Sequence, residues 1–191
     1  MRSPAITMLK SALPTLPTVL AFALFATAVH ADETPYNKGT AAWRAKDYAE
    51  ARKQWEASIA QGGPDEAFNN LGYLRYYGLG SDADPAVAVE LWRKGAALSV
   101  SEAQLHLGEA YKKGRGVAKS LALAYAWHLC AIATADKLAA SDETESAILK
   151  SATQSLNKLR LELTPTEQAE GERLGKDLIS RYGSRLSLTP P

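Results

Sequence analysis

The sequence has few cysteines and histidines and no excess of basic residues. It has one cysteine, Cys130, so no intramolecular disulfide can form, and we expect this thiol to be a small buried hydrophobe. Its three histidines lack a second ligand at zinc-site spacing. The 22 basic and 21 acidic residues leave a net charge of +1 with no basic stripe. We therefore expect no cofactor, no metal and no nucleic-acid partner.

The N-terminal segment lacks an apolar run long enough to span a membrane. The run over residues 19–29 has about half of the ~20 residues that a spanning helix needs. Two basic residues and no acidic ones lie before Asp32, and Ala31 ends the segment. These features predict a secretory signal peptide over residues 1–31, cleaved after Ala31. The mature protein would then be periplasmic or secreted, with no integral membrane segment. An uncleaved N-terminal anchor is the alternative.

An ungapped internal repeat with a period of 36 residues follows. Residues 66–72 (EAFNNLG) align with residues 102–108 (EAQLHLG), and each copy continues into a Gly-x-Gly sequence. Each unit is predicted to form two antiparallel helices, the first ending at its Gly-x-Gly, because glycine accepts the left-handed conformation of a helix C-cap. Glycine inside a helix costs about 1 kcal/mol relative to alanine. We therefore expect a neighbouring backbone to pack against Gly72 and Gly108.

The repeat and its flanks predict an all-α fold of eight helices and no strand. The pattern Asp47, Ala51 and Trp55 matches Asp84, Ala88 and Trp92, which adds a shorter upstream unit. The capping-box sequence Thr164-Pro165-Thr166-Glu167 predicts the start of the last helix. We expect residues 32–182 to form a right-handed α-solenoid of stacked antiparallel helix hairpins with a C-terminal helical cap. The expected segments are repeat-like units at 36–62, 65–100 and 101–136, capping helices at 142–163 and 165–182, and a flexible tail at 183–191.

One stretch of the repeat resembles a known family. Leu107-Gly108, Tyr111, Gly114-x-Gly116-Val117 and Ala124-Tyr125-Ala126-Trp127 are similar to the Sel-one-like repeat, a helical hairpin related to the tetratricopeptide repeat. The likeness extends from Asn37 to about Arg181. It implies the solenoid fold and an adaptor role, often in the bacterial envelope. The unit at 65–100 departs from the family pattern, since Arg75 stands where tyrosine is usual. We expect Arg75 to face solvent or a partner.

The resemblance also implies a binding surface, because the first helices of such hairpins line a concave groove. Positions are counted from the repeat glycines Gly39, Gly72 and Gly108. The predicted groove residues are Tyr36, Trp43, Arg44, Asn69, Tyr73, Tyr76, Glu109 and Lys112. Tyrosine and tryptophan on a rigid groove provide contact area at low entropic cost, which suits peptide recognition. For Tyr76 and Tyr77, packing between units is an equal alternative.

These features predict a non-catalytic interaction scaffold that binds a protein or peptide partner. No spacing typical of a catalytic site is present, and His128 takes the position of Trp92, which favours core packing over catalysis. One alternative is a glycan- or peptidoglycan-binding envelope protein that uses the same aromatic residues as sugar platforms. A cell-wall-related hydrolase is a weaker alternative, because the exported relatives linked to such chemistry carry paired cysteines that this chain lacks.

Overall fold

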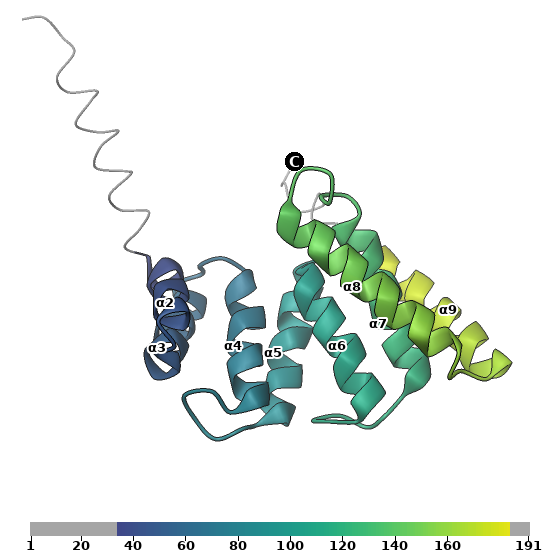
Figure 1. Ribbon diagram of the computed structural model, residues 1–191, viewed down its shortest axis with the longest axis horizontal. Helices are drawn as coiled ribbons and strands as arrows, with labels where there is room; N and C mark the ends of the chain where they lie inside the picture. Colours follow the sequence, from purple (N-terminus) through teal and green to yellow (C-terminus); the bar gives the residue numbers. More distant parts are fainter. Residues whose placement is uncertain (1–33, 184–191) are drawn as a thin grey trace, which may run out of the picture. The chain divides into compact units, whose positions relative to one another are not determined.

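The computed structural model describes residues 34–183, so the predicted signal peptide lies outside the described residues. This part of the chain holds eight α-helices and no strand, which confirms the all-α solenoid (Figure 1). Three hairpins come first, followed by two longer helices. Their bounds are α2 (Pro35–Arg44) with α3 (Tyr48–Ala60), α4 (Glu66–Tyr77) with α5 (Pro85–Ala97), α6 (Ser101–Lys113) with α7 (Leu121–Ala135), then α8 (Glu143–Arg160) and α9 (Pro165–Tyr182).

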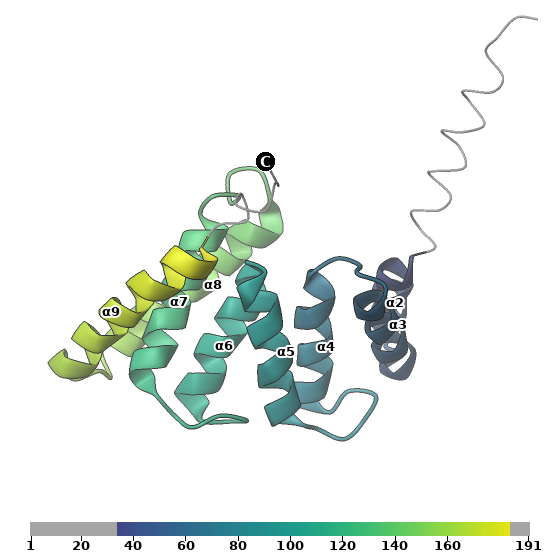
Figure 2. The same cartoon turned by 180° about the vertical axis from the view of Figure 1, so that it is seen from behind.

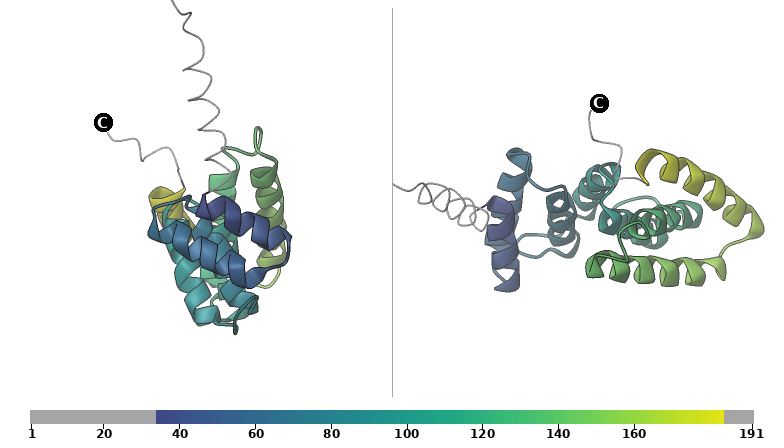
Figure 3. Two further views of the ribbon diagram at one scale, coloured as in Figure 1. Left: turned by 90° about the vertical axis from the view of Figure 1, so that its left-hand side faces the viewer. Right: turned by 90° about the horizontal axis from the view of Figure 1, so that it is seen from above.

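The last two helices pack on the third hairpin. Both contact α7, and α8 also contacts α6 while α9 contacts α5. Seen from above, α8 and α9 lie on opposite sides of α7 (Figure 3), and the view from behind shows α9 along α7 (Figure 2). Helix α8 therefore adjoins the first helix of the third hairpin, and α9 adjoins the second helices of the second and third hairpins. None of the helices in residues 34–183 is long and apolar enough to cross a membrane.

Each hairpin is closed by a glycine that packs against a ring. A Cβ atom added to the mid-helix glycine of the first helix would lie 2.6 Å from ring atoms of the second helix. The pairs are Gly39 with Trp55, Gly72 with Trp92, and Gly108 with His128. The expectation of a neighbouring backbone at these glycines is therefore wrong. The absent side chain makes room for an aromatic ring, which lets the two helices of a hairpin approach closely.

Glycines do pack against a neighbouring backbone in the Gly-x-Gly loops, where each loop contacts the preceding hairpin. Gly78 and Gly114 cap their helices with φ of 71° and 67°, as predicted. The second glycine of each loop also has positive φ. A Cβ on Gly80 would lie 2.5 Å from the backbone at Tyr48, and one on Gly116 would collide with the backbone at Pro85. Each loop therefore packs on the N-terminus of the second helix of the preceding hairpin.

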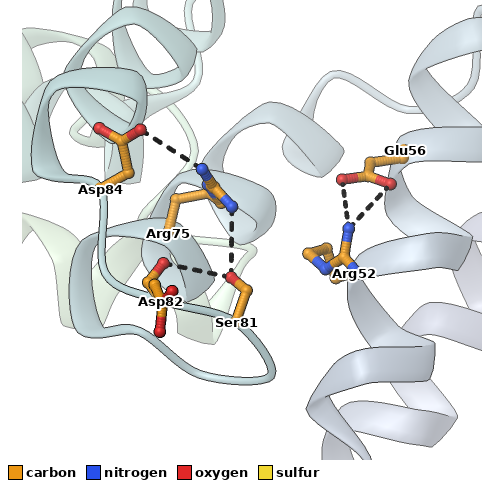
Figure 4. A network of polar contacts seen from close by, with 6 residues as sticks. All are labelled: Arg52, Glu56, Arg75, Ser81, Asp82 and Asp84. Carbon is orange, nitrogen blue, oxygen red and sulfur yellow. Dashed lines mark hydrogen bonds and ion pairs between the residues drawn. The ribbon is translucent and has the colours of Figure 1, made fainter.

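Arg75 bonds within its own hairpin, where we expected it to face solvent or a partner. Its Nη1 donates to Ser81 Oγ at 3.3 Å, and its Nη2 lies 3.4 Å from Asp84 Oδ2 (Figure 4). Asp84 also caps α5 by accepting from the amide of Val87. Arg75 thus joins the last turn of α4 to its loop and to the start of α5. Figure 4 also shows the ion pair of Arg52 with Glu56 in α3.

Candidate binding groove

Half of the predicted groove residues lie together in one pocket. This pocket has a volume of about 610 Å³ and takes its walls mainly from α2 and α4, the first helices of the first two hairpins, with one residue each from α3, α6 and α8. Its lining includes four of the eight predicted residues, namely Tyr36, Trp43, Asn69 and Tyr73. The remaining lining residues are Thr40, Trp55, Asn70, Glu102 and Thr144.

A second pocket of about 380 Å³ continues the first towards the start of α8. The two share Tyr36, Asn70, Glu102 and Thr144. The second pocket adds Glu66, Val100, Ser101, Asp142, Glu145 and Ile148. We refer to the two pockets together as the groove.

The other four predicted residues lie outside the groove. Tyr76 and Glu109 line a separate pocket of about 240 Å³, together with Tyr77. Tyr76 is only 3% exposed, and its ring centroid lies 4.9 Å from that of Trp92 in the core. Tyr77 is 47% exposed. Arg44 is exposed and lines no part of the groove. Lys112 pairs with Glu162 of the chain at 2.8 Å.

The aromatic side chains of α2 and α4 contact one another in the groove, and Tyr73 also contacts a ring of α6 that does not line it. Trp43 of α2 meets Tyr73 of α4 edge to face, with centroids 5.5 Å apart and planes at 85°. Tyr73 in turn lies 5.7 Å from the ring of His106 in α6. Burial raises the pKa of the Tyr73 hydroxyl, which therefore stays protonated at neutral pH. These rings give the groove a rigid apolar wall with half-buried edges.

The polar wall of the groove centres on Asn69 and Glu102. Asn69 is 2% exposed, and its Nδ2 donates to Glu102 Oε2 at 2.8 Å, which joins α4 to α6. Asn69 Oδ1 has no hydrogen-bond partner. Burial raises the pKa of Glu102, the nearby carboxylate of Glu145 raises it further, and the hydrogen bond from Asn69 opposes both.

Sequence reasoning missed Glu102 and the α8 residues of the groove. A signal for Glu102 exists, because Glu66 and Glu102 occupy the same repeat position and both line the groove. Asp142, Thr144 and Glu145 lie beyond the repeat, so the 36-residue register carries no information about them. The contact of α8 with α6 brings them to the groove.

Comparison with known proteins agrees with this geometry. The family model of the Sel1 repeat matches residues 66–100 and 101–133, the second and third hairpins. The chain carries two Sel1 repeats. Such repeats generally form protein-interaction scaffolds. The first hairpin and the last two helices lie outside the matched residues.

Two solved structures resemble this Sel1-repeat chain. One is c5321, a protective antigen of uropathogenic Escherichia coli strains that displays an SLR fold, with 26% identity and a TM-score of 0.68. The match covers 78% of this chain and 30% of that one, so the chain spans less than a third of that protein's length. The other is a Sel1 repeat protein from Oxalobacter formigenes, with 23% identity, coverage of 66% and 56%, and a TM-score of 0.48. A search of curated proteins found no match.

The second Sel1 repeat departs from the other hairpins by placing a histidine against its glycine. His128 is fully buried and neither of its ring nitrogens has a hydrogen-bond partner, although Nε2 lies 3.6 Å from Glu109 Oε1. Cys130 is also fully buried, and burial raises its pKa to about 12, which makes it a structural residue as expected. Within residues 34–183, no group of three or more His, Cys, Asp or Glu side chains could hold a metal.

We expect the two buried histidines to make the fold sensitive to mild acid. Burial lowers the pKa of His106 and of His128 from 6.5 to about 4. As the pH falls, the unfolded chain therefore binds these protons before the folded chain does. The contribution of the neutral histidines to the free energy of unfolding is fully present above pH 6.5 and is lost as the pH drops towards 4. Between pH 7 and pH 5 the loss should be about 2 kcal/mol for each histidine, or about 4 kcal/mol for the two together, measured by urea denaturation at each pH.

The control for this prediction is the double variant His106→Phe, His128→Phe. It keeps a ring against Trp92 and against Gly108 but cannot take up a proton. Its stability should change much less over the same pH range. Glu102 acts in the opposite direction because its pKa is raised. An equal pH dependence in both proteins would assign the effect to other groups.

Proposed function

We propose that this protein is a non-catalytic scaffold of the bacterial envelope that binds a peptide or protein segment in the groove. The observation that carries the proposal is that the groove crosses the first helices of three successive hairpins and then reaches α8. An extended segment can contact all four helices along this path. Aromatic and polar side chains both line this path, which suits recognition of both side chains and backbone.

The contacts between the aromatic side chains favour a peptide over a glycan. A sugar platform needs an open aromatic face, but the Trp43 and Tyr73 rings are held edge to face with each other. Tyr73 also lies 4.6 Å from the ring of Tyr77. These contacts cover part of the aromatic surface that a stacked sugar ring would need, whereas a peptide can also use the polar side chains beside the rings.

Location in the envelope is part of the proposal and rests on the N-terminal sequence. The charged start, the apolar run and the small residues before Asp32 support export with cleavage after Ala31. Residues 34–183 then form the exported scaffold.

Photo-crosslinking in cells tests the proposal. The full sequence is expressed with a photoreactive amino acid in place of Thr144, which is exposed and lines both pockets of the groove. The matched control carries it at Leu161, which is 88% exposed and lines neither pocket. We expect a discrete protein adduct in the envelope fraction from position 144 and none from position 161.

The products of this experiment separate the alternatives. An adduct that disappears on digestion with a muramidase, and yields no foreign peptides, would assign the groove to glycan. An adduct of twice the mass of the chain would assign it to a second copy. Either result, or equal adducts at both positions, would contradict the proposal.

A further inference from the structure

We propose that the groove recognises an arginine side chain of its partner, held between Glu102 and Asn69 beside the aromatic wall. This inference rests on the proposed function and names the chemistry of the bound segment. It depends on three features of the groove: an unpaired buried acceptor, an excess of acidic side chains, and flat rings next to both.

The first feature is the unpaired oxygen of Asn69. A carboxylate only accepts hydrogen bonds, so the amide atom 2.8 Å from Glu102 Oε2 must be the nitrogen, and the other atom is the oxygen. This oxygen has no hydrogen-bond partner, although Asn69 is only 2% exposed. Buried acceptors are normally satisfied. Because this oxygen is itself buried, a donor from a bound segment reaches it when the Asn69 side chain shifts as the segment binds.

The second feature is the excess of acidic side chains in the lining of the groove. The lining of the groove includes four carboxylates, those of Glu66, Glu102, Asp142 and Glu145, and no Lys, Arg or His side chain. In the described part of the chain, the carboxylate of Glu102 lies 3.9 Å from Nε2 of His106, and burial lowers the pKa of this histidine to about 4, so it is neutral at neutral pH.

The two groove carboxylates at the start of α8 also accept hydrogen bonds from neutral groups. Asp142 caps α8, and Glu145 accepts a hydrogen bond from Ser101. Both contacts are with neutral groups. A partially buried carboxylate flanked by like charge is stabilised by an incoming cation, so charge complementarity points to a basic side chain of the partner.

The third feature selects arginine among basic groups. Guanidinium carries five N–H donors in one plane, so it can bond the Glu102 carboxylate and the Asn69 oxygen together, and its flat face suits contact with aromatic rings. Lysine provides a compact, strongly hydrated charge without that fork. The protein uses arginine in this way elsewhere. Arg115 lies over the Tyr76 ring at 4.4 Å while its Nη2 donates to the Tyr76 carbonyl at 2.8 Å.

Selection from a random twelve-residue peptide library against the full chain tests this inference. We expect the bound peptides to share one position rich in arginine. Peptides are then synthesised with that residue as arginine, lysine or citrulline, the last being a neutral isostere of arginine. Binding measured by fluorescence anisotropy should weaken about tenfold or more with citrulline and to a smaller extent with lysine.

Variants of the protein test whether the arginine of the peptide binds at Glu102. Glu102→Gln should weaken the arginine peptide about tenfold and leave the citrulline peptide nearly unchanged, so the two peptides then bind alike. Glu170→Gln is the matched control, since Glu170 is an exposed α9 residue that pairs with Arg173 outside the groove. It should change neither affinity. The melting temperature of each variant shows that it is folded.

The outcomes separate this inference from the proposed function. Peptides that bind without a basic position, a citrulline peptide that binds as well as the arginine peptide, or a lysine peptide that binds equally would each overturn the inference. The scaffold role would then stand on the bound peptides alone. If no peptide binds and no adduct forms at position 144, both the inference and the proposed function fail.

Discussion

Replacing Trp92 with alanine should lower the free energy of unfolding by about 3–5 kcal/mol. The indole ring is 1% exposed and fills the space left by the absent side chain of Gly72. Its other contacts are the rings of Tyr76 and His106, with centroids 4.9 Å and 4.8 Å away. A helix pair held this closely cannot collapse around an alanine, so a large cavity remains.

Two further variants separate the parts of this effect. Trp92→Phe keeps most of the packing but removes the hydrogen bond from Nε1 to the carbonyl of Asn69, at 3.2 Å, and should cost about 1–3 kcal/mol. Leu161→Ala removes an apolar side chain that is 88% exposed and should change stability by less than about 0.5 kcal/mol. Urea denaturation measures all three. A loss below about 1 kcal/mol for Trp92→Ala would contradict the role of the glycine–ring contact.

The sequence predicts best what is encoded within one helix or one repeat. Thr164 caps α9 as expected and forms the full capping box with Glu167. Gly78 and Gly114 end their helices in the left-handed conformation. Each of these signals depends only on neighbouring residues, so tertiary packing has little opportunity to override it.

The candidate groove was harder to predict because it combines several elements. Tyr36, Trp43, Asn69 and Tyr73 come together because the repeat register places them on the same side of successive first helices. The same counting puts Tyr76 in the groove, but its ring lies beneath Arg115 of the next hairpin. Only the packed helices show that.

The charge of the groove depends even less on local pattern. Part of it comes from α8, whose position is set by its packing on α6 and α7 and not by the repeat. The contact partner of the repeat glycines was misassigned for a related reason. Trp55, Trp92 and His128 share one register position, which could have pointed to a ring, but the spacing between the helices of a hairpin is a tertiary property.

The second large effect concerns the junction between hairpins, at Gly116. Gly116→Ala should lower the free energy of unfolding by about 2–4 kcal/mol, through left-handed backbone strain and overpacking. Its φ is +80°, and an added Cβ would collide with the carbonyl of Pro85, at the start of α5. Backbone in the first turn of a helix cannot move aside as a flexible side chain can, so the loop or the stacking of the two Sel1 repeats must shift.

Gly62→Ala is the matched control, because it carries the same backbone strain without the collision. Gly62 has φ of +67°, and an added Cβ would meet no atom within 4 Å. This substitution should cost only the strain, about 1 kcal/mol. The difference between the two free energies of unfolding, measured by urea denaturation, therefore isolates the contact between successive hairpins. Equal losses would mean that the Gly116 loop moves away freely. The second glycine of each Gly-x-Gly would then serve the turn and not the stacking on which the groove depends.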